Sequence, residues 1–141
     1  MKEQPKSGHR TLYRVIYGDT DTMGFAYYAN YLRWFEIGRT EMFRSLGLSY
    51  HSIEERGIFL PVAEARCKYR SPARYDDLLV IETALQKGVK AGLTFVYRIL
   101  QEKDASCVAE GCTRHPFMDK AGKVVRPPDF VRKVLRDSPF V

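Results

Sequence analysis

The amino-acid sequence predicts an α+β fold in which one long helix packs against a single antiparallel β-sheet. One amphipathic segment of about 19 residues is long enough for a helix of about five turns. Several other segments alternate apolar and polar residues, as half-buried strands do. The connections between these strands are short, which favours antiparallel neighbours because parallel neighbours need long crossovers.

The chain is expected to begin with a tail and one strand. Residues 1–10 are predicted to form a flexible N-terminal tail, so that the folded domain covers residues 11–141. Residues 11–17 (TLYRVIY) are rich in β-branched and aromatic side chains, which favours a strand. The next residues, GDTDTMGFA, have the Gly, Asp and Thr content of a loop.

The long helix is predicted over about Tyr28 to Leu46. At about 100° per residue, half of its circumference is apolar, which is typical of a helix cradled by a curved sheet. Gly38 lies within this apolar stripe, where a missing side chain is expected to let another backbone approach closely. Arg39 also lies within the stripe, so we expect it to form a structural ion pair. The apolar side chains are Tyr31, Leu32, Trp34, Phe35, Met42, Phe43 and Leu46.

Four further strands and a short terminal helix are predicted after Gly57. The strands cover residues 62–70, 78–86, 93–101 and 107–115, and the helix covers about 129–135. In the first of these strands, Ala63, Ala65, Cys67 and Tyr69 share one face. A single helix cannot cover both faces of five strands. Because Phe95, Tyr97 and Ile99 add a second apolar stretch, we expect another subunit to cover part of the sheet.

Composition narrows the class of protein. A chain of 141 residues fits one domain. The net charge of +6 comes from scattered Lys and Arg residues, which favours solubility or a phosphate-bearing ligand over nucleic acid. The three cysteines form no C-x-x-C pair, which predicts a reduced, cytoplasmic protein without a metal site. No secretory signal or membrane span is expected, since the first residues are polar and no apolar run approaches about 18 residues.

The segment most informative about chemistry is residues 17–31. It places two carboxylates and a glycine directly before the start of the long helix. Free backbone amides at a helix N-terminus carry partial positive charge and can bind a polarised carbonyl oxygen. A neighbouring carboxylate can attack an ester-like carbon or activate a water molecule. Simple capping and turn formation explain the same spacing, so spacing alone leaves both interpretations open.

The sequence YGDTDTMGFAYYANY, followed by LRWFEIGRTEMF, closely resembles the signature of the 4-hydroxybenzoyl-CoA thioesterase family of hotdog proteins. The segments ERGIFLPV, SPARYDDLLVIET and VRPP resemble the same family in the same order, so the likeness covers about residues 11–135. This resemblance implies a hotdog fold, in which an antiparallel β-sheet wraps around one long central α-helix. It also implies metal-free and cofactor-free hydrolysis of an acyl-CoA or acyl-carrier-protein thioester. Family members form dimers with joined sheets and active sites at the subunit interface, so we expect a homodimer or homotetramer.

The resemblance also assigns roles to residues of the loop. Asp21 matches the aspartate that lies beside the thioester carbon, as a nucleophile or as a general base. Tyr28 matches the position whose backbone amide holds the thioester oxygen. Gly24 is expected to keep the loop small enough for the substrate to approach, and Asp19 to shape the loop.

Three further residues are expected to bind the substrate. Val62 and Ala63 match the strand that lines the acyl or pantetheine channel. Lys90 stands where relatives contact the CoA phosphates, although a solvated turn lysine explains it equally well. Arg126 is a second phosphate candidate. The acyl group itself is not predicted.

Other reaction classes find less support. A serine hydrolase would need a G-x-S-x-G elbow, which the sequence lacks. Cys112 and His115 lie three positions apart on one predicted strand and therefore point to opposite faces. A hotdog dehydratase would need a histidine in the loop motif. A non-catalytic acyl-CoA-binding protein would gain little from Asp21.

Overall fold

The computed structural model describes residues 8–86 and 92–140. These residues form a five-stranded sheet, one long helix, two shorter helices and one turn of 3-10 helix. The elements in chain order are β1 (His9–Arg14), the 3-10 helix η1 (Tyr17–Asp19), α1 (Asn30–Ser45), α2 (Tyr50–Glu55), β2 (Glu64–Tyr69), β3 (Leu78–Leu85), β4 (Gly92–Gln101), β5 (Cys107–Pro116) and α3 (Asp129–Arg136).

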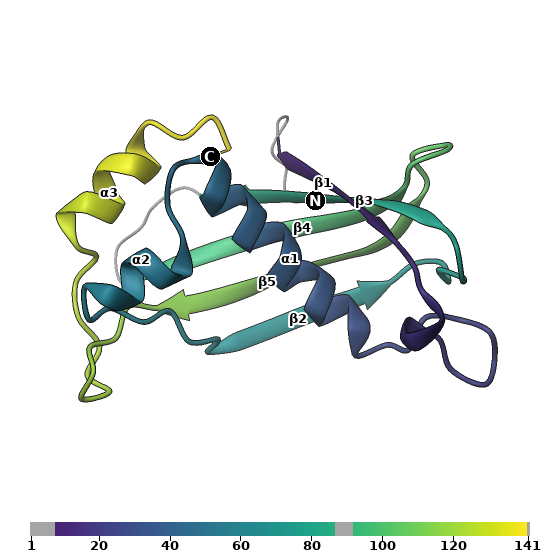
Figure 1. Ribbon diagram of the computed structural model, residues 1–141, viewed down its shortest axis with the longest axis horizontal. Helices are drawn as coiled ribbons and strands as arrows, with labels where there is room; N and C mark the ends of the chain where they lie inside the picture. Colours follow the sequence, from purple (N-terminus) through teal and green to yellow (C-terminus); the bar gives the residue numbers. More distant parts are fainter. Residues whose placement is uncertain (1–7, 87–91, 141) are drawn as a thin grey trace.

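All neighbouring strands are antiparallel, in the order β1-β3-β4-β5-β2. The strands β1 and β2 are therefore the two edges of the sheet. Figure 1 shows α1 lying diagonally across one face of the sheet, with α2 and α3 beyond one end of it. This arrangement confirms the predicted α+β hotdog architecture.

The main core lies between α1 and the sheet. Phe35 of α1 stacks on Tyr97 of β4 with ring centroids 4.2 Å apart, and Phe43 meets Phe95 edge-on at 5.4 Å. Phe95, Tyr97 and Ile99 are all buried in the single chain. These three side chains therefore need no second subunit to bury them, contrary to the prediction, because the single chain already does so.

The opposite face of the sheet carries cross-strand ion pairs. Glu82 of β3 accepts hydrogen bonds from Arg10 of β1 at 2.9 Å and from Arg98 of β4 at 2.8 Å. Arg70 pairs with Glu110 at the other side of the sheet. Such paired charges are compatible with water, so this face differs sharply from the aromatic face under α1.

Gly38 allows a close approach of α1 to the sheet, but the groups that it meets are side chains of β3 and not the predicted backbone. A Cβ atom at this position would lie 2.3 Å from Thr83 Oγ1 and 2.7 Å from Ile81 Cγ2. Arg39 is buried as its position in the stripe predicts. Its predicted ion pair is not found among the described residues, where the phenol groups of Tyr50 and Tyr97 are its electrostatic neighbours instead.

Three elements differ from prediction at their ends or in kind. β1 starts at His9 and stops at Arg14, because residues 17–19 turn into a 3-10 helix instead of continuing the strand. α1 is two residues shorter at its start than predicted. The helix α2 was not predicted, although Ser49 caps it by accepting a hydrogen bond from the Ser52 amide at 3.0 Å.

Candidate active site

Asp19 anchors the loop between β1 and α1. Its side chain is buried, and its Oδ2 accepts hydrogen bonds from the Tyr13 hydroxyl at 2.7 Å and the Ile16 amide at 3.0 Å. Its backbone carbonyl accepts from Asn30 Nδ2 at 2.8 Å and from the Tyr27 amide at 2.7 Å. Asp19 therefore ties the loop to both β1 and the start of α1, as expected of a loop-shaping residue.

Asp21, two residues further on, is only partly bonded to its own chain. Its Oδ1 accepts from the Met23 amide at 2.9 Å and, at 3.4 Å, from the Phe25 amide. Its Oδ2 forms no hydrogen bond within the described residues. One oxygen of the carboxylate thus shapes the turn, while the other remains available to a ligand.

Gly24 closes the turn that presents Asp21. Its φ is +84°, and its amide donates to the Asp21 carbonyl at 3.1 Å. A Cβ at this position would meet nothing within 4 Å, so the backbone conformation and not crowding within this chain requires a glycine. Gly24 does not line the pocket described below.

Two adjacent backbone amides are unpaired where α1 begins. The amides of Tyr28 and Ala29 donate to no acceptor in residues 8–86 and 92–140, whereas the Tyr27 amide bonds to Asp19 and the Asn30 amide to the Tyr27 carbonyl at 2.9 Å. The positive end of the helix dipole lies at the same place. An oxygen atom that carries negative charge would be stabilised here.

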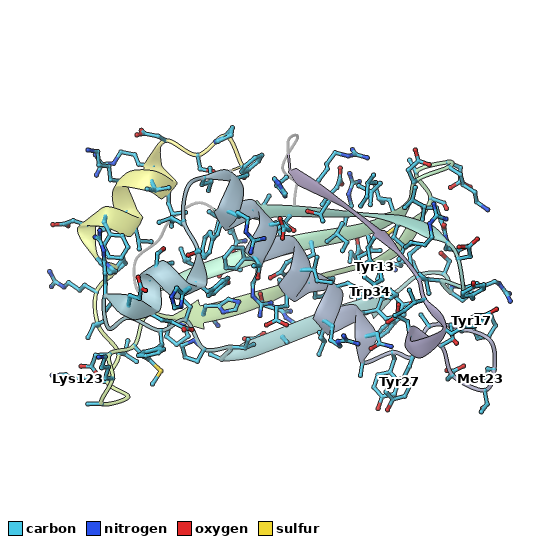
Figure 2. The ribbon with its side chains drawn as sticks, in the orientation of Figure 1. Tyr13, Tyr17, Met23, Tyr27, Trp34 and Lys123 are labelled. Carbon is cyan, nitrogen blue, oxygen red and sulfur yellow. The ribbon has the colours of Figure 1, made fainter. Side chains whose placement is uncertain are left out.

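Asp21 and Tyr28 line one pocket of about 340 Å³. Four of its ten lining residues are aromatic, and the acidic residue among them is Asp21. Figure 2 shows Tyr17, Met23 and Tyr27 at this end of the molecule and Lys123 at the opposite end. The lining residues are Asp21, Met23, Phe25, Ala26, Tyr28, Tyr31, Tyr69, Arg70, Ser71 and Pro72.

Val62 and Ala63, which were predicted to bind the substrate, do not line this pocket within one chain. Val62 and Ala63 are exposed and precede β2, about 20 Å along the strand from the pocket residue Tyr69. Lys90 lies outside the described residues. Arg126 is exposed and follows the Lys123 turn, which lies at the end of the molecule opposite the loop (Figure 2).

Cys112 and His115 lie on opposite faces of β5, as predicted, and His115 is on the face that packs into the core. His115 is buried, with Nε2 2.8 Å from Thr113 Oγ1 and Nδ1 3.1 Å from the Leu60 carbonyl oxygen. Burial lowers the pKa of His115 to about 4. The histidine is therefore neutral near pH 7 and has a structural place.

Residues 8–86 and 92–140 contain no cluster of three or more His, Cys, Asp or Glu side chains that could hold a metal ion. Within the same residues, no helix has the length and apolar character needed to cross a membrane.

Residues 15–135 match the family model described as the thioesterase-like superfamily. The chain belongs to this superfamily. Its fold is shared by a hypothetical protein of Aquifex aeolicus of known crystal structure, with a TM-score of 0.84 and 32% identity over 90% of this chain and 98% of that one. A DHNA-CoA thioesterase from Staphylococcus aureus superimposes with a TM-score of 0.79 and 29% identity over 83% and 78% of the two chains. In sequence, the acyl-CoA thioester hydrolase YbgC of Escherichia coli O6:H1 is 34% identical over 91 residues, which are 64% of this chain and 68% of that protein.

Tyr69 lines the pocket, which the sequence did not indicate. The sequence predicted only which face of its strand it occupies. Its hydroxyl donates to the Tyr28 carbonyl at 3.0 Å, and its ring meets that of Tyr31 edge-on at 4.9 Å. These contacts join residues about 40 positions apart. The alternation of β2 places Tyr69 on the face toward α1, but only the sheet order shows which part of α1 it reaches.

Proposed function

We propose that this protein hydrolyses acyl-CoA thioesters to a free carboxylic acid and CoA. The observation that carries the proposal is one pocket lined by both Asp21, whose Oδ2 makes no hydrogen bond within the described residues, and Tyr28, whose amide is unpaired within the same residues. The names of YbgC and of the S. aureus protein, both thioester-cleaving enzymes, support the same chemistry.

In the proposed reaction the thioester carbonyl oxygen lies at the start of α1. The amides of Tyr28 and Ala29 donate to this oxygen, on which negative charge develops as the carbon is attacked. Preorganised backbone donors of this kind stabilise the transition state more than the ground state. The helix dipole adds to the same effect.

Asp21 can supply the attack in two ways, and both stay open. As a nucleophile, its carboxylate oxygen bonds to the thioester carbon while the C–S bond breaks and CoA leaves as a thiolate that takes up a proton. Water then cleaves the resulting mixed anhydride and restores the carboxylate. As a general base, Asp21 removes a proton from a water molecule whose oxygen bonds to the carbon directly. The C–S bond then breaks, and the departing CoA thiolate takes up the proton, which restores the carboxylate.

We further propose that the site is completed by a second copy of the chain. β2 is an edge strand, and antiparallel pairing with the β2 of a second copy would bring Val62 and Ala63 of one copy close to Tyr69 of the other. This pairing would reconcile the predicted substrate-binding role of these residues with their distance from Asp21 in one chain. A dimer or a tetramer built from such dimers would satisfy it. Lys90 as a phosphate contact and a cytoplasmic location stay predictions.

The test of the function is hydrolysis of a panel of aromatic, short aliphatic and long-chain acyl-CoAs by the wild-type protein, measured by thiol release. We expect turnover of at least one class with saturation kinetics. Binding of these esters without any thiol release would contradict the proposal and favour the non-catalytic acyl-CoA-binding alternative. No histidine lines the pocket, so a dehydratase has no side-chain support there.

The test of the assembly is light scattering of the active protein during size-exclusion chromatography. We expect a mass of two or four chains. A fully active monomer would contradict the shared site.

A further inference from the structure

The unpaired amides of Tyr28 and Ala29 belong to two peptide units whose carbonyl oxygens both accept hydrogen bonds. The Tyr27 carbonyl accepts from the Asn30 amide at 2.9 Å. The Tyr28 carbonyl accepts from the Tyr31 amide at 3.3 Å and from the Tyr69 hydroxyl at 3.0 Å. In a trans peptide the N–H points away from the C=O, so each bond to a carbonyl also fixes the direction of the amide that follows it.

The peptide that Tyr69 holds is the one whose amide belongs to Ala29. Its backbone bond from the Tyr31 amide, at 3.3 Å, is slightly longer than usual for an N–H donor, so the bond from the Tyr69 hydroxyl at 3.0 Å adds a second restraint on the orientation of this peptide. A donor at the carbonyl also polarises the peptide and makes its N–H a better donor, because hydrogen bonds in a chain strengthen one another.

We propose that Tyr69 is a positioning residue for the thioester oxygen: its hydroxyl orients and polarises the Tyr28–Ala29 peptide, so that the Ala29 amide acts beside the Tyr28 amide as a second donor to that oxygen. This proposal rests on the proposed function. It adds a side chain from the edge strand β2 to a site otherwise built from the loop and the start of α1.

The surroundings of Tyr69 suit this role. Its ring packs edge-on against Tyr31, whose own hydroxyl accepts from the Ala73 amide at 3.4 Å, so the phenol is held in one direction. Removal from water raises the pKa of Tyr69 to about 12, so the hydroxyl keeps its proton over the physiological range. Toward a carbonyl oxygen it can act only as a donor.

A purely structural role is distinguishable because Tyr69 is half-exposed and the Tyr28 carbonyl has a second donor. Removing the hydroxyl leaves no buried polar group without a partner, so Tyr69→Phe should fold with unchanged thermal stability. Its effect should fall on the chemical step, where charge on the substrate oxygen is largest.

The experiment compares the kinetics of wild type, Tyr69→Phe and Tyr75→Phe with one acyl-CoA. Tyr75 stacks on Tyr17 outside the pocket, so its variant makes the same chemical change away from the site. Loss of a complete oxyanion donor typically costs about 10²–10³ in rate, so misorienting one should lower kcat of Tyr69→Phe about tenfold. We expect KM within about twofold of wild type and an unchanged kcat for Tyr75→Phe.

A second measurement reports on the polarisation of the Tyr28–Ala29 peptide itself. In the amide NMR spectrum of the free protein, the Ala29 resonance should move upfield in Tyr69→Phe and stay in place in Tyr75→Phe, because the polarising bond is lost only in the first. An unchanged kcat, a loss confined to KM, or an unmoved Ala29 resonance would each overturn the role of Tyr69. Failure of the wild-type enzyme to release thiol would overturn the proposed function itself, which the kinetics of the wild type show separately.

Discussion

Two regions of the molecule differ in whether their polar groups have hydrogen-bond partners: the sheet beneath α1, and the loop at the start of α1. Under α1, the Tyr97 hydroxyl lies 2.6 Å from Thr113 Oγ1, which in turn lies 2.8 Å from His115 Nε2. His115 Nδ1 completes the chain at the Leu60 carbonyl. At the loop, Asp21 Oδ2 and the amides before α1 have no such partners among the described residues.

The direction of each bond in the buried chain follows from chemistry. A carbonyl oxygen only accepts, so the His115 Nδ1 carries the proton and, in the neutral ring, Nε2 accepts from Thr113. Thr113 then accepts from Tyr97. Every member is satisfied, so this chain has a structural role and offers nothing to a ligand. The contrast supports the proposal that the substrate binds at the loop end, where two backbone amides and one carboxylate oxygen have no partner within the described residues.

The largest effect expected of this buried hydrogen-bond chain is on how the free energy of unfolding depends on pH. The pKa of His115 is lowered to about 4 in the folded protein, so the unfolded chain binds a proton below about pH 6.5 while the folded one does not. The contribution of neutral His115 is complete above about pH 6.5 and is lost as the pH falls from there to about 4. The loss amounts to about 3 kcal/mol of unfolding free energy.

Urea unfolding at several pH values, with and without His115→Gln, measures this effect. Between pH 6.5 and 4, the free energy of unfolding of the variant should fall less steeply with decreasing pH than that of wild type, because the His115 contribution is absent. The contribution of the carboxylates to this pH dependence should remain. An NMR titration of the wild-type imidazole provides a check that does not depend on folding of the variant. A His115 pKa near 6.5 would contradict the account.

The next effect separates the two aspartates of the loop. Asp19→Ala removes the acceptor of the Tyr13 hydroxyl and the Ile16 amide, which should cost about 2 kcal/mol of unfolding free energy. Asp21→Asn keeps an oxygen for the Met23 and Phe25 amides, so its unfolding midpoint in urea should match wild type. Equal destabilisation by both variants would remove the distinction between an anchoring and a free carboxylate.

The smallest effect concerns the approach of α1 to the sheet. In Gly38→Ala the new Cβ would crowd the buried Thr83 side chain, and overpacking typically costs about 1–3 kcal/mol. Alanine regains up to about 1 kcal/mol of helix propensity, so we expect a net loss of about 1 kcal/mol in thermal unfolding. Glu36→Ala, an exposed change in the same helix, serves as the control. If Gly38→Ala were more stable than wild type, α1 and the Thr83 side chain would have space for the added methyl group, which would contradict the account.

Much of the fold follows from the sequence because periodicity reports burial. The alternation of β3, β4 and β5 and the wide apolar stripe of α1 predict these elements within a few residues. The same pattern groups side chains by face, but it does not show which face the helix covers. This is why Phe95 and Tyr97 suggested a second subunit when they in fact lie under α1.

The remaining differences arise from contacts distant in sequence. β1 ends at Arg14 because residues 17–19 turn into the 3-10 helix η1, where Asp19 accepts from the Ile16 amide, whatever the β propensity of the residues there. Arg39 has phenol groups for neighbours because Tyr97 of β4 and Tyr50 of α2 both lie close to it. Tyr69 reaches the Tyr28 carbonyl only through the position of β2 at the sheet edge. The loop motif, by contrast, is local, and its two aspartates could be singled out from sequence.

The central claim is that Asp21 supplies the attack beside the unpaired amides, and Asp21→Asn tests it most directly. With an acyl-CoA that the wild type hydrolyses, we expect kcat to fall at least about 10²-fold while KM and the unfolding midpoint stay near wild type. The control is Asp119→Asn, whose carboxylate also accepts turn amides, from Ala121 and Lys123, but at the opposite end of the molecule. Thiol release by Asp21→Asn at a rate close to wild type would contradict the claim.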